Sequence, residues 1–586
     1  MTQMTLSSFA ERARVWRLLT QVTWQSFLKW LHGGPLFRWR PFSGSPQRLL
    51  IAPQDLRTSD GTNAADIYSG RFLFAGQLAE ARGRSPFEID PPSADWARAL
   101  HGFGWLRHLK AAETVVARQN ARALVDDWIR HCGYWHEIGW DQTVVTRRVL
   151  AWLSQSPLIL DGCDREFYRR FLRSLARQVR YLRRTINETP DGVPRLGAAI
   201  AVAAATVSMS GQGRYVRQSL RRLDQELARQ ILPDGGHVSR NPGALLDILV
   251  DLLPVRQALT VQGLPSSQTV MQAIDRMMPM VRFFRHTDGA FAHFNGMGST
   301  PADLVATILA YDDARGSPPG NAPHSGYQRI SAGDSVVLFE TGRPPPVDLS
   351  QSAHAGCLSF ELSSRRSRII VNCGVSNTER GAWRTVARST PAHSTATLND
   401  TSSARFLAAT SYGGWLGSPI LAGPTHVPVE REEGEGGLRV VASHNGYQDT
   451  HHVVHQRDLT LSRDGSVLDG IDRFMPTGKT PRKDAFAIRF HLHPAIKASP
   501  VRSGTAILLM APDGEAWEFV APGCETTIEE SIYLSDTYGH RRTEQIVIHG
   551  RLAHRREAAW QLRRTATGKT ARRRVSDGPA SEDLDL

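Results

Sequence analysis

Residues 316–323, with the sequence GSPPGNAP, separate two parts of the chain that differ in hydrophobic periodicity. A short run so rich in Gly and Pro supports neither a helix nor a central strand, so we predict a linker over residues 313–323. Before the linker, apolar residues recur every three or four positions; after it, they alternate with polar residues. The sequence therefore predicts a helical domain over residues 45–312 and a β-domain over residues 324–565.

The helical period is clearest in residues 165–184. Its apolar side chains follow steps of four, four, four and three: Phe167, Phe171, Leu175, Val179 and Leu182. Seven arginines surround this stripe: Arg169, Arg170, Arg173, Arg177, Arg180, Arg183 and Arg184. Because no aromatic residues are interleaved with them, we favour a solvated outer face over a nucleic-acid-binding face and expect no nucleic-acid partner. Further helices are predicted at 113–132, 142–154, 196–209, 215–230 and 242–261, and such repeated helix pairs indicate a bundle or a toroid.

Short strands separated by turn residues are predicted after the linker. They cover residues 334–340, 357–362, 367–371, 438–442, 458–461, 486–492, 505–510 and 516–520. Many short strands without intervening helices indicate an antiparallel β-sandwich. Residues 566–586, a basic stretch followed by an acidic tail, are predicted to be disordered.

The N-terminal segment, residues 1–44, is predicted to contain an amphipathic helix over residues 6–31 and a linker. Trp16, Trp24 and Trp30 lie among basic residues there, as in helices that contact a membrane surface. Packing of this helix on the body of the protein is the favoured alternative. We find no secretory signal and no apolar run long enough to cross a bilayer, so we expect a cytoplasmic or inner-membrane-surface location.

Composition and missing motifs exclude several classes of protein. The chain has 586 residues and a net charge of +13, which favours polyanionic partners. Its five cysteines are odd in number and form no C-x-x-C pair, which argues against a disulfide framework; pairing of Cys357 with Cys373 remains an alternative to reduced thiols. P-loop, HExxH and GxSxG motifs are absent, so ATP-driven, zincin and α/β-hydrolase functions have no support.

One polar loop between two predicted helices, residues 233–242, stands out. It places His237, Arg240 and Asn241 on a short turn with two adjacent glycines. Three hydrogen-bond donors at this spacing suit the binding of a carboxylate. A capped interhelical turn with an exposed histidine is an equally weighted interpretation.

Five ordered motifs resemble the heparinase II/III family over about residues 50–565. They are PDGGHVSRNP (233–242), FRHTDG (284–289), AHAGCLSFEL (353–362), RSTPAHST (388–395) and HNGY (444–447). The resemblance implies an incomplete (α/α) toroid followed by an antiparallel β-sandwich. It also implies a polysaccharide lyase that cleaves uronic-acid polymers by β-elimination: one group neutralises the uronate carboxylate, a base removes the C5 proton, and an acid protonates the leaving oxygen.

The resemblance also suggests site residues. The catalytic candidates are His237, Asn241, His293, His354, His393 and Tyr447, and the substrate-binding candidates within the motifs are Arg240 and Arg388. Trp140, Arg147 and Arg148 are further substrate-binding candidates on their own chemistry, because they would supply a sugar-stacking face and positive charge near a cleft. Tryptophans such as Trp140 would stack on sugars, although helix packing is the favoured interpretation of any single one. Some family members hold a metal at positions matching His354, Asn372 and His393. Because Asn372 replaces a carboxylate, we expect no metal here and no required cofactor.

The sequence departs from the family pattern at two further places. No Tyr occurs between Tyr215 and Tyr311, where the family's catalytic Tyr is expected, so His286, His293 or Tyr447 would have to replace it. Ser352 occupies the position of the first His in the family's His-x-His.

Two other functions therefore stay open. The first is a non-catalytic binder of an acidic cell-envelope polysaccharide, tethered through residues 6–31. The second is a glycoside hydrolase on the same toroid, with Asp234 and Asp288 as its carboxylates. Family relatives generally act outside the cytoplasm, which conflicts with the missing export signal.

Overall fold

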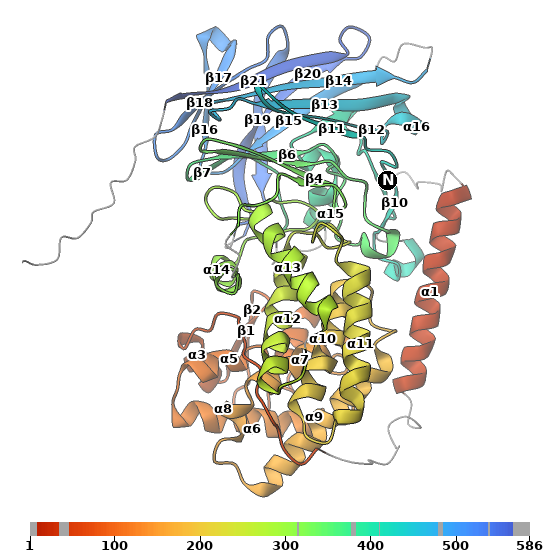
Figure 1. The fold of residues 1–586 in the computed structure, drawn as a ribbon, viewed down its shortest axis with the longest axis vertical. Helices are drawn as coiled ribbons and strands as arrows, with labels where there is room; N and C mark the ends of the chain where they lie inside the picture. The colour runs from red at the N-terminus through yellow and green to blue at the C-terminus, as the bar shows by residue number, and fades with distance from the viewer. Residues whose placement is uncertain are drawn as a thin grey trace, which may run out of the picture.

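The computed structural model describes residues 9–33, 46–265, 267–312, 316–376, 382–408, 411–478, 484–536 and 539–566. The helical region forms one end of the molecule and the β-domain the other (Figure 1). The last helix before the change, α14, ends at Ala310, and the first strand of the β-domain, β3, begins at Asn321. Predictions for residues 1–8, 34–45, 313–315 and the tail beyond residue 566 fall outside the described residues.

The helical region consists of a β-hairpin and helices of one to six turns. The hairpin is β1 (Arg71–Phe74) and β2 (Gln77–Glu80). The helices are α3 (Thr62–Tyr68), α4 (Ala94–Gly102), α5 (Leu106–Ala111), α6 (Val115–His131), α7 (Gln142–Ser154), α8 (Ser156–Leu160), α9 (Arg165–Thr185), α10 (Val193–Ser208), α11 (Gly213–Gln230), α12 (Gly243–Val261), α13 (Gln268–Phe283) and α14 (Ala302–Ala310). Each of the longer predicted helices is present within a few residues of its predicted bounds.

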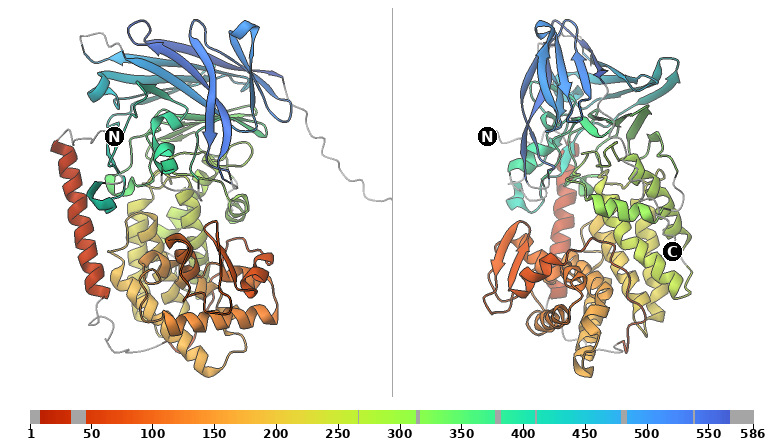
Figure 2. Two further views of the ribbon diagram at one scale, coloured as in Figure 1. Left: turned by 180° about the vertical axis from the view of Figure 1, so that it is seen from behind. Right: turned by 90° about the vertical axis from the view of Figure 1, so that its left-hand side faces the viewer.

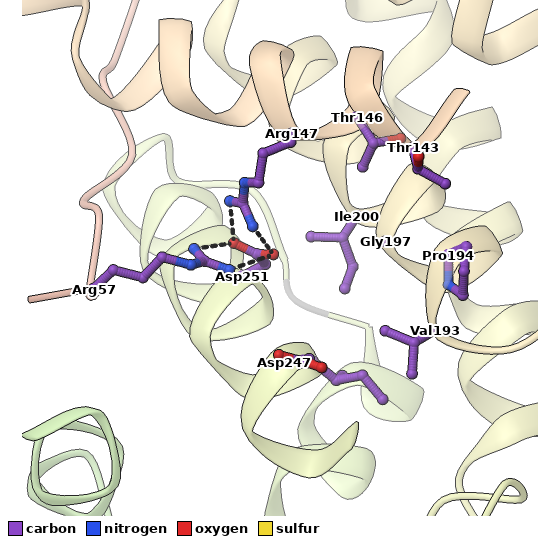
Figure 3. A pocket seen from close by; sticks show the side chains of 11 residues that line it. Arg57, Thr143, Thr146, Arg147, Val193, Pro194, Gly197, Ile200, Asp247 and Asp251 are labelled. Carbon is purple, nitrogen blue, oxygen red and sulfur yellow. Dashed lines mark hydrogen bonds and ion pairs between the residues drawn. The ribbon is translucent and has the colours of Figure 1, made fainter. Parts of the chain in front are cut away.

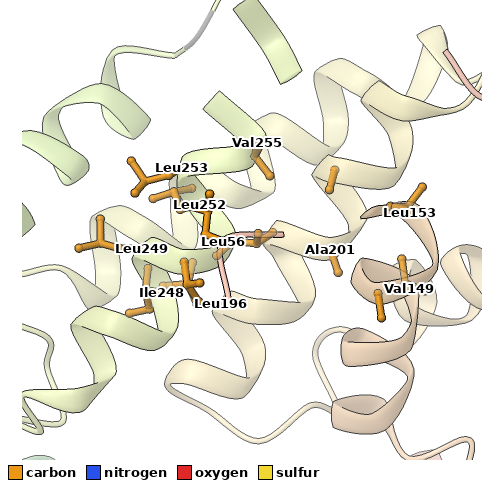
Figure 4. Close-up of a cluster of buried hydrophobic side chains, with 14 of the residues drawn as sticks. Leu56, Val149, Leu153, Leu196, Ala201, Ile248, Leu249, Leu252, Leu253 and Val255 are labelled. Carbon is orange, nitrogen blue, oxygen red and sulfur yellow. The ribbon is translucent and has the colours of Figure 1, made fainter. Parts of the chain in front are cut away.

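Helix α10 forms the centre of this region because it is rich in alanine. Its small side chains let α7, α11 and α12 approach closely on different sides. Leucine, valine and isoleucine side chains of α7 and α12 pack around it (Figure 4). The apolar run that is too short for a bilayer is therefore a buried core helix. Among the described residues, no helix is long and apolar enough to cross a membrane.

The β-domain is an antiparallel sandwich of two open sheets. One sheet has eight strands in the order β11 (Val429–Gly434), β12 (Gly437–His444), β13 (Val453–Leu461), β14 (Val467–Pro476), β21 (Glu557–Ala566), β18 (Ala516–Val520), β17 (Ala506–Met510) and β16 (Lys497–Val501). The other has nine: β19 (Glu525–Tyr533), β20 (Arg541–Arg551), β15 (Ala485–Leu492), β7 (Ser367–Val371), β6 (Phe360–Ser364), β5 (Ser335–Glu340), β4 (Tyr327–Ala332) and β3 (Asn321–Ala322), with β8 (Ala396–Leu398) beside β15. The predicted fold class, a helical domain followed by an antiparallel sandwich, is confirmed.

Some details of the β-domain differ from the sequence prediction. Residues 357–359 form a turn before β6, because Leu358 takes a positive φ of 63° that an extended strand does not allow. The cysteines are all free, including the buried Cys357 and Cys373, so the considered disulfide is not formed. The aromatic core between the sheets includes Phe360, whose ring stacks on Trp560 at 5.5 Å.

A buried arginine joins the two domains. Arg240, at the start of α12, sends its guanidinium into the β-domain, where it donates to the carbonyl oxygens of Ser325, Gly326, Gly342 and Arg343 at 2.8–3.2 Å. It also forms an ion pair with the buried carboxylate of Glu340 at 3.0 Å. A methyl group at Gly342 would lie 2.7 Å from the guanidinium, so this close approach needs a glycine. We call this arrangement the Arg240 clamp.

Helix α1 (Phe9–Gly33) lies along the side of the molecule (Figure 1). Its buried Val15 and Leu18 pack on Leu407, Leu416 and Leu421 of the β-domain. Glu11 forms an ion pair with Arg405. The favoured interpretation, that this helix packs on the body, therefore holds for one of its faces. Three large apolar side chains remain exposed: Trp16 (68%), Trp24 (61%) and Phe27 (49%).

Replacing Arg240 should destabilise the protein strongly. The substitution Arg240→Ala leaves the Glu340 carboxylate buried without its cation, and breaking a buried pair in this way costs about 3–5 kcal/mol. Thermal unfolding should show a large drop in midpoint for Arg240→Ala and a partial recovery for the double variant Arg240→Ala/Glu340→Gln. Arg365→Ala is the control, because its ion pair with Asp334 lies at the surface and is worth about 0–1 kcal/mol. Equal midpoints for the two single variants would show that the clamp does not hold the domains.

Candidate functional site

The loop with three predicted donors, residues 233–242, docks on the β-domain. Asp234 accepts hydrogen bonds from the backbone N–H of Gly236 at 3.0 Å and of Ser325 at 2.7 Å. A methyl group at Gly235 would lie 2.0 Å from the carbonyl oxygen of Arg276, and Gly235 has a φ of 89°, so only glycine fits this turn. The glycine pair therefore sets the path of the loop.

His237 is buried within this loop rather than exposed. Its Nδ1 accepts a hydrogen bond from the backbone N–H of Ser239 at 3.1 Å, so its Nε2–H donates to Oε1 of Gln230 at 3.0 Å. Burial lowers the pKa of His237 to about 4, and the ring is neutral near pH 7. Both ring nitrogens are therefore used in contacts within the helical region.

Arg240 is also used within the protein. Each nitrogen of its guanidinium has a partner in the clamp described above. We therefore reassign Arg240 from substrate binding to domain docking. The physical reason is that four carbonyl oxygens and the Glu340 carboxylate already surround the Arg240 guanidinium, so it cannot bind the carboxylate of a uronate.

Asn241 is the partly exposed member of the predicted catalytic set. Its Oδ1 accepts a hydrogen bond from the N–H of Gly243 at 2.8 Å, which fixes the side chain at the start of α12. Its Nδ2 lies near Gly296, where a methyl group would be 3.4 Å from this nitrogen and 2.9 Å from the carbonyl oxygen of Ser352. The amide of Asn241 therefore lies at the junction of the two domains, beside residues 352–354.

His354 and His393, predicted from two separate motifs, form a hydrogen-bonded pair. Nδ1 of His354 lies 3.0 Å from Nε2 of His393, whose Nδ1 lies 2.8 Å from the carbonyl oxygen of Ser389. Because a carbonyl only accepts, His393 carries its proton on Nδ1, and Nδ1–H of His354 must donate to Nε2 of His393. The Nε2 lone pair of His354 is then left buried without a partner. Burial lowers the pKa of His393 to about 4.

A second polar cluster surrounds Glu361 on β6. Its carboxylate accepts from the backbone N–H groups of His293 and Asn372 at 3.1 and 2.9 Å, and Oε2 lies 2.8 Å from Nε2 of His286. Burial alone would raise the pKa of Glu361, but the nearby imidazoles and these hydrogen bonds lower it to about 2. His286 and His293 thus support a buried carboxylate.

Tyr533, which no sequence motif indicated, lies against His293. Its hydroxyl oxygen is 3.4 Å from Nε2 of His293, and it accepts a hydrogen bond from Arg368 at 2.9 Å. Tyr533 ends β19, more than two hundred residues away in sequence, so only the tertiary structure brings it to the motif histidine. Burial raises its pKa to about 12.

Several other predicted site residues have structural roles. The indole N–H of Trp140 donates to the carbonyl oxygen of Cys132, and Tyr447 donates its hydroxyl proton to the carbonyl oxygen of Ala396 in the sandwich core. Arg148 is fully buried over the face of Trp128 at 3.9 Å and donates to Gln178. Arg388 donates to the carbonyl oxygens of Ser350, Ala353 and Ser418. Their interior hydrogen bonds place these residues outside any solvent-accessible site.

Neither a metal site nor a glycosidase pair emerges from the described residues. Within the described ranges, no group of three or more His, Cys, Asp or Glu side chains is arranged to hold a metal ion. Asn372 has a neutral amide where the family has a carboxylate, and its Oδ1 already accepts a hydrogen bond from the backbone N–H of Ser394. His354, Asn372 and His393 therefore do not fit a metal ion. Asp288 forms an ion pair with Arg368 at 2.9 Å, and Asp234 holds Ser325, so neither carboxylate is free for glycoside hydrolysis.

Arg147 lines a pocket in the helical region of about 200 Å³ (Figure 3). Asp251 lies between Arg147 and Arg57 and accepts two hydrogen bonds from each at 2.8–3.2 Å. Asp247 lines the same pocket as a solvent-exposed carboxylate without a hydrogen bond to a described residue. Val193 forms part of the wall and follows Gly192, where a methyl group would meet Leu349 of the β-domain at 2.9 Å. The pocket therefore lies close to the domain junction, and its Asp247 follows Asn241 by six residues in the sequence.

Taken together, the helical ring, the antiparallel sandwich and the asparagine and histidines at their junction define a protein with a polysaccharide-lyase fold. The family model "Heparinase II/III-like, C-terminal" matches residues 314–568. FtsZ-localized protein C of Caulobacter vibrioides (strain NA1000 / CB15N) is 32% identical over 533 residues, which cover 89% of this chain and 90% of that protein. This chain belongs to the heparinase II/III family, as the sequence motifs predicted.

Solved structures show the same fold. A crystal structure of heparinase III has a TM-score of 0.65 at 15% identity, covering 95% of this chain and 92% of that chain. The heparan sulfate lyase HepC from Pedobacter heparinus has a TM-score of 0.58 at 15% identity, covering 94% of this chain and 89% of that one. These matches confirm the predicted arrangement of a toroid followed by a sandwich.

The buried neutral histidines should make stability depend on pH. The pKa values of His237, His293 and His393 are lowered to about 4, below the value of about 6.5 in an unfolded chain. Between these values the unfolded state binds more protons, so stability is full above about pH 6.5 and falls as the pH drops toward about 4. Thermal midpoints measured across this range should fall less steeply for His393→Gln than for the wild type. His426→Gln, at an exposed position, is the control and should keep the wild-type slope.

Proposed function

We propose that this chain uses the lyase fold to bind an acidic, uronic-acid-containing polysaccharide of the cell envelope without cleaving it by β-elimination. The proposal rests on the solvent exposure of the six predicted catalytic residues. Asn241 is partly exposed, whereas His237, His293, His354, His393 and Tyr447 are at most 3% exposed. An amide that can bind a carboxylate is thus partly exposed at the junction, while the imidazole and phenol groups that would transfer protons are buried.

The chemistry of the junction supports recognition more than elimination. An amide N–H can donate to a uronate carboxylate, and Arg147 and Asp247 lie in the neighbouring pocket to meet charge and hydroxyl groups of a sugar. β-Elimination additionally needs a base near C5 and an acid at the leaving oxygen. The family's helical-domain Tyr is missing, and Tyr533 is 3% exposed behind His293. The residues that remain, Asn241, Arg147 and Asp247, fit a binding site better than a lyase active site.

Binding without cleavage is the expected outcome with a panel of polyuronates and glycosaminoglycans. The purified chain should retain a polymer on affinity electrophoresis, yet produce no ultraviolet absorbance from an unsaturated uronate product. Asn241→Ala should weaken binding about tenfold or more, as expected for the loss of a hydrogen bond to a charged group. Gln561→Ala, on a sandwich strand, is the matched control. Steady formation of unsaturated product would instead restore the lyase function, and unchanged binding by Asn241→Ala would remove Asn241 from the site.

A second candidate function comes from the similarity to FtsZ-localized protein C. Since 32% identity extends over 89% of this chain, we propose that this chain also associates with FtsZ. The proposed location of this chain is then the inner-membrane surface where FtsZ gathers.

Localisation of a fluorescent fusion tests this second function. In Caulobacter vibrioides cells that carry labelled FtsZ, the fusion should gather where FtsZ gathers and disperse when FtsZ is depleted. The same fusion with Asn241→Ala tests whether the two functions are independent: normal localisation would show that association with FtsZ does not need the proposed polysaccharide site. A uniform distribution with FtsZ present contradicts the association.

The proposed membrane contact rests on the outer face of α1. Val15 is buried, and Trp24 follows it by nine residues, which is two and a half helical turns, so the two side chains lie on opposite sides of the helix. Trp24 and Phe27 are exposed neighbours with ring centroids 5.8 Å apart. Exposed aromatic side chains next to basic ones are typical of helices that lie on a membrane surface.

A further inference from the structure

A concave cluster of arginines lies on the helical region, apart from the domain junction. Five of them line one cavity of about 520 Å³ between α9, α10 and α11: Arg183, Arg214, Arg217, Arg221 and Arg222. We call this cavity the arginine groove. The arginines of α9 were predicted to form a solvated outer face, and α11 adds a second row of arginines that lines the same cavity.

The groove has an excess of positive charge. Arg222 bonds to Asn187 at 2.5 Å and forms an ion pair with Glu226 at 3.0 Å. Arg183, Arg214, Arg217 and Arg221 have no acidic partner among the described residues. Like charges three or four residues apart destabilise a helix, and α11 carries such a series in Arg214, Arg217 and Arg221. These like charges lower the stability of the helix, and no acidic side chain of the described residues offsets them. They therefore favour the binding of an anion from outside the protein.

Tyr215 holds part of the groove in place. The guanidinium of Arg183 lies 3.6 Å and that of Arg214 lies 4.6 Å from its ring centroid. These cation–π contacts orient two arginines, one from each helix, and leave their N–H groups available as donors. Arginine forks of this kind match the geometry of phosphate oxygens.

The position of α1 indicates which anion the groove meets. Helix α1 runs along the same side of the helical region as α11 in Figures 1 and 2. The exposed Trp24 and Phe27 of α1 supply apolar contact, and the groove supplies positive charge. An anionic phospholipid surface satisfies both features, whereas a soluble polyanion would leave the aromatic face of α1 uncovered.

We propose that the arginine groove binds the phosphate headgroups of anionic phospholipids when α1 lies on a membrane. This proposal rests on the membrane contact of α1 proposed above and deepens it by naming the lipid charge that the protein selects. The helical region would then face the membrane along the α1 and α11 side, which leaves the sandwich and the junction site accessible to polysaccharide.

Vesicle flotation with the full chain tests the proposal. The probes are vesicles of phosphatidylcholine alone and vesicles of phosphatidylcholine with phosphatidylglycerol. The wild type should prefer the anionic vesicles, and Arg217→Glu/Arg221→Glu should lower binding to them about tenfold or more. The control Arg169→Glu/Arg173→Glu makes the same charge change at the same spacing on exposed positions of α9 outside the groove, and should stay near the wild type. Thermal midpoints verify that each variant is folded.

Three results would overturn the groove assignment. They are equal binding of the two vesicle types by the wild type, equal weakening by both double variants, and loss of polyuronate affinity in Arg217→Glu/Arg221→Glu with vesicle binding intact. The double variant Trp24→Ala/Phe27→Ala tests the membrane contact of α1 separately from the groove, since it should weaken binding to both vesicle types. If the wild type floats with neither vesicle, the tether itself fails, and polysaccharide binding by the junction is still measured independently.

Discussion

The burial of one guanidinium group between the domains is the constraint on which the rest of this structure depends. Arg240 cannot leave its cradle of four carbonyl oxygens without stranding Glu340, whose pKa burial already raises. The clamp also positions its neighbours. Tyr327 donates to the carbonyl oxygen of Arg240 at 2.6 Å, and Asn295 donates to both Tyr327 and Glu340 at 2.8 Å. Through the Oδ1 of Asn295, which accepts from the N–H of His354, the clamp reaches the histidine pair.

This chain of contacts explains why a lyase-like set of residues becomes a structural network. Buried histidines are held neutral, because desolvation disfavours their charged form. Neutral imidazoles with both nitrogens engaged make good interior hydrogen-bonding groups and poor proton shuttles. The described structure leaves several polar atoms of this network without a hydrogen-bond partner: Nε2 of His354, Nδ1 of His293, Nδ2 of Asn372 and Oε2 of Glu340. Asn241, in contrast, keeps its amide at the junction, where a carboxylate can reach it.

The two proposed binding sites lie on different areas of the surface of the molecule. The junction and its pocket combine an amide, arginines and a carboxylate, which suits a sugar acid. The α1 and α11 side combines exposed aromatic rings with arginines most of which have no acidic partner among the described residues, which suits a lipid surface. Because these areas lie on different elements, the proposed polysaccharide contact and the proposed membrane contact do not exclude each other.

Periodicity and turn composition were enough to predict the architecture. Apolar steps of four and three residues predicted α9, and the Gly- and Pro-rich residues 316–323 placed the change to β-structure, because each pattern reports backbone geometry along a local stretch of chain. The motifs also identified the family. The sequence did not reveal which groups each polar side chain contacts. Arg240 and Asn241 are adjacent in one loop, yet Arg240 is enclosed by the β-domain and Asn241 faces the junction. Tyr533 and the second row of arginines in the groove are likewise distant in sequence from the residues they meet. Burial and ion pairing depend on which surfaces come together in three dimensions, so the role of each polar side chain became visible only in the folded molecule.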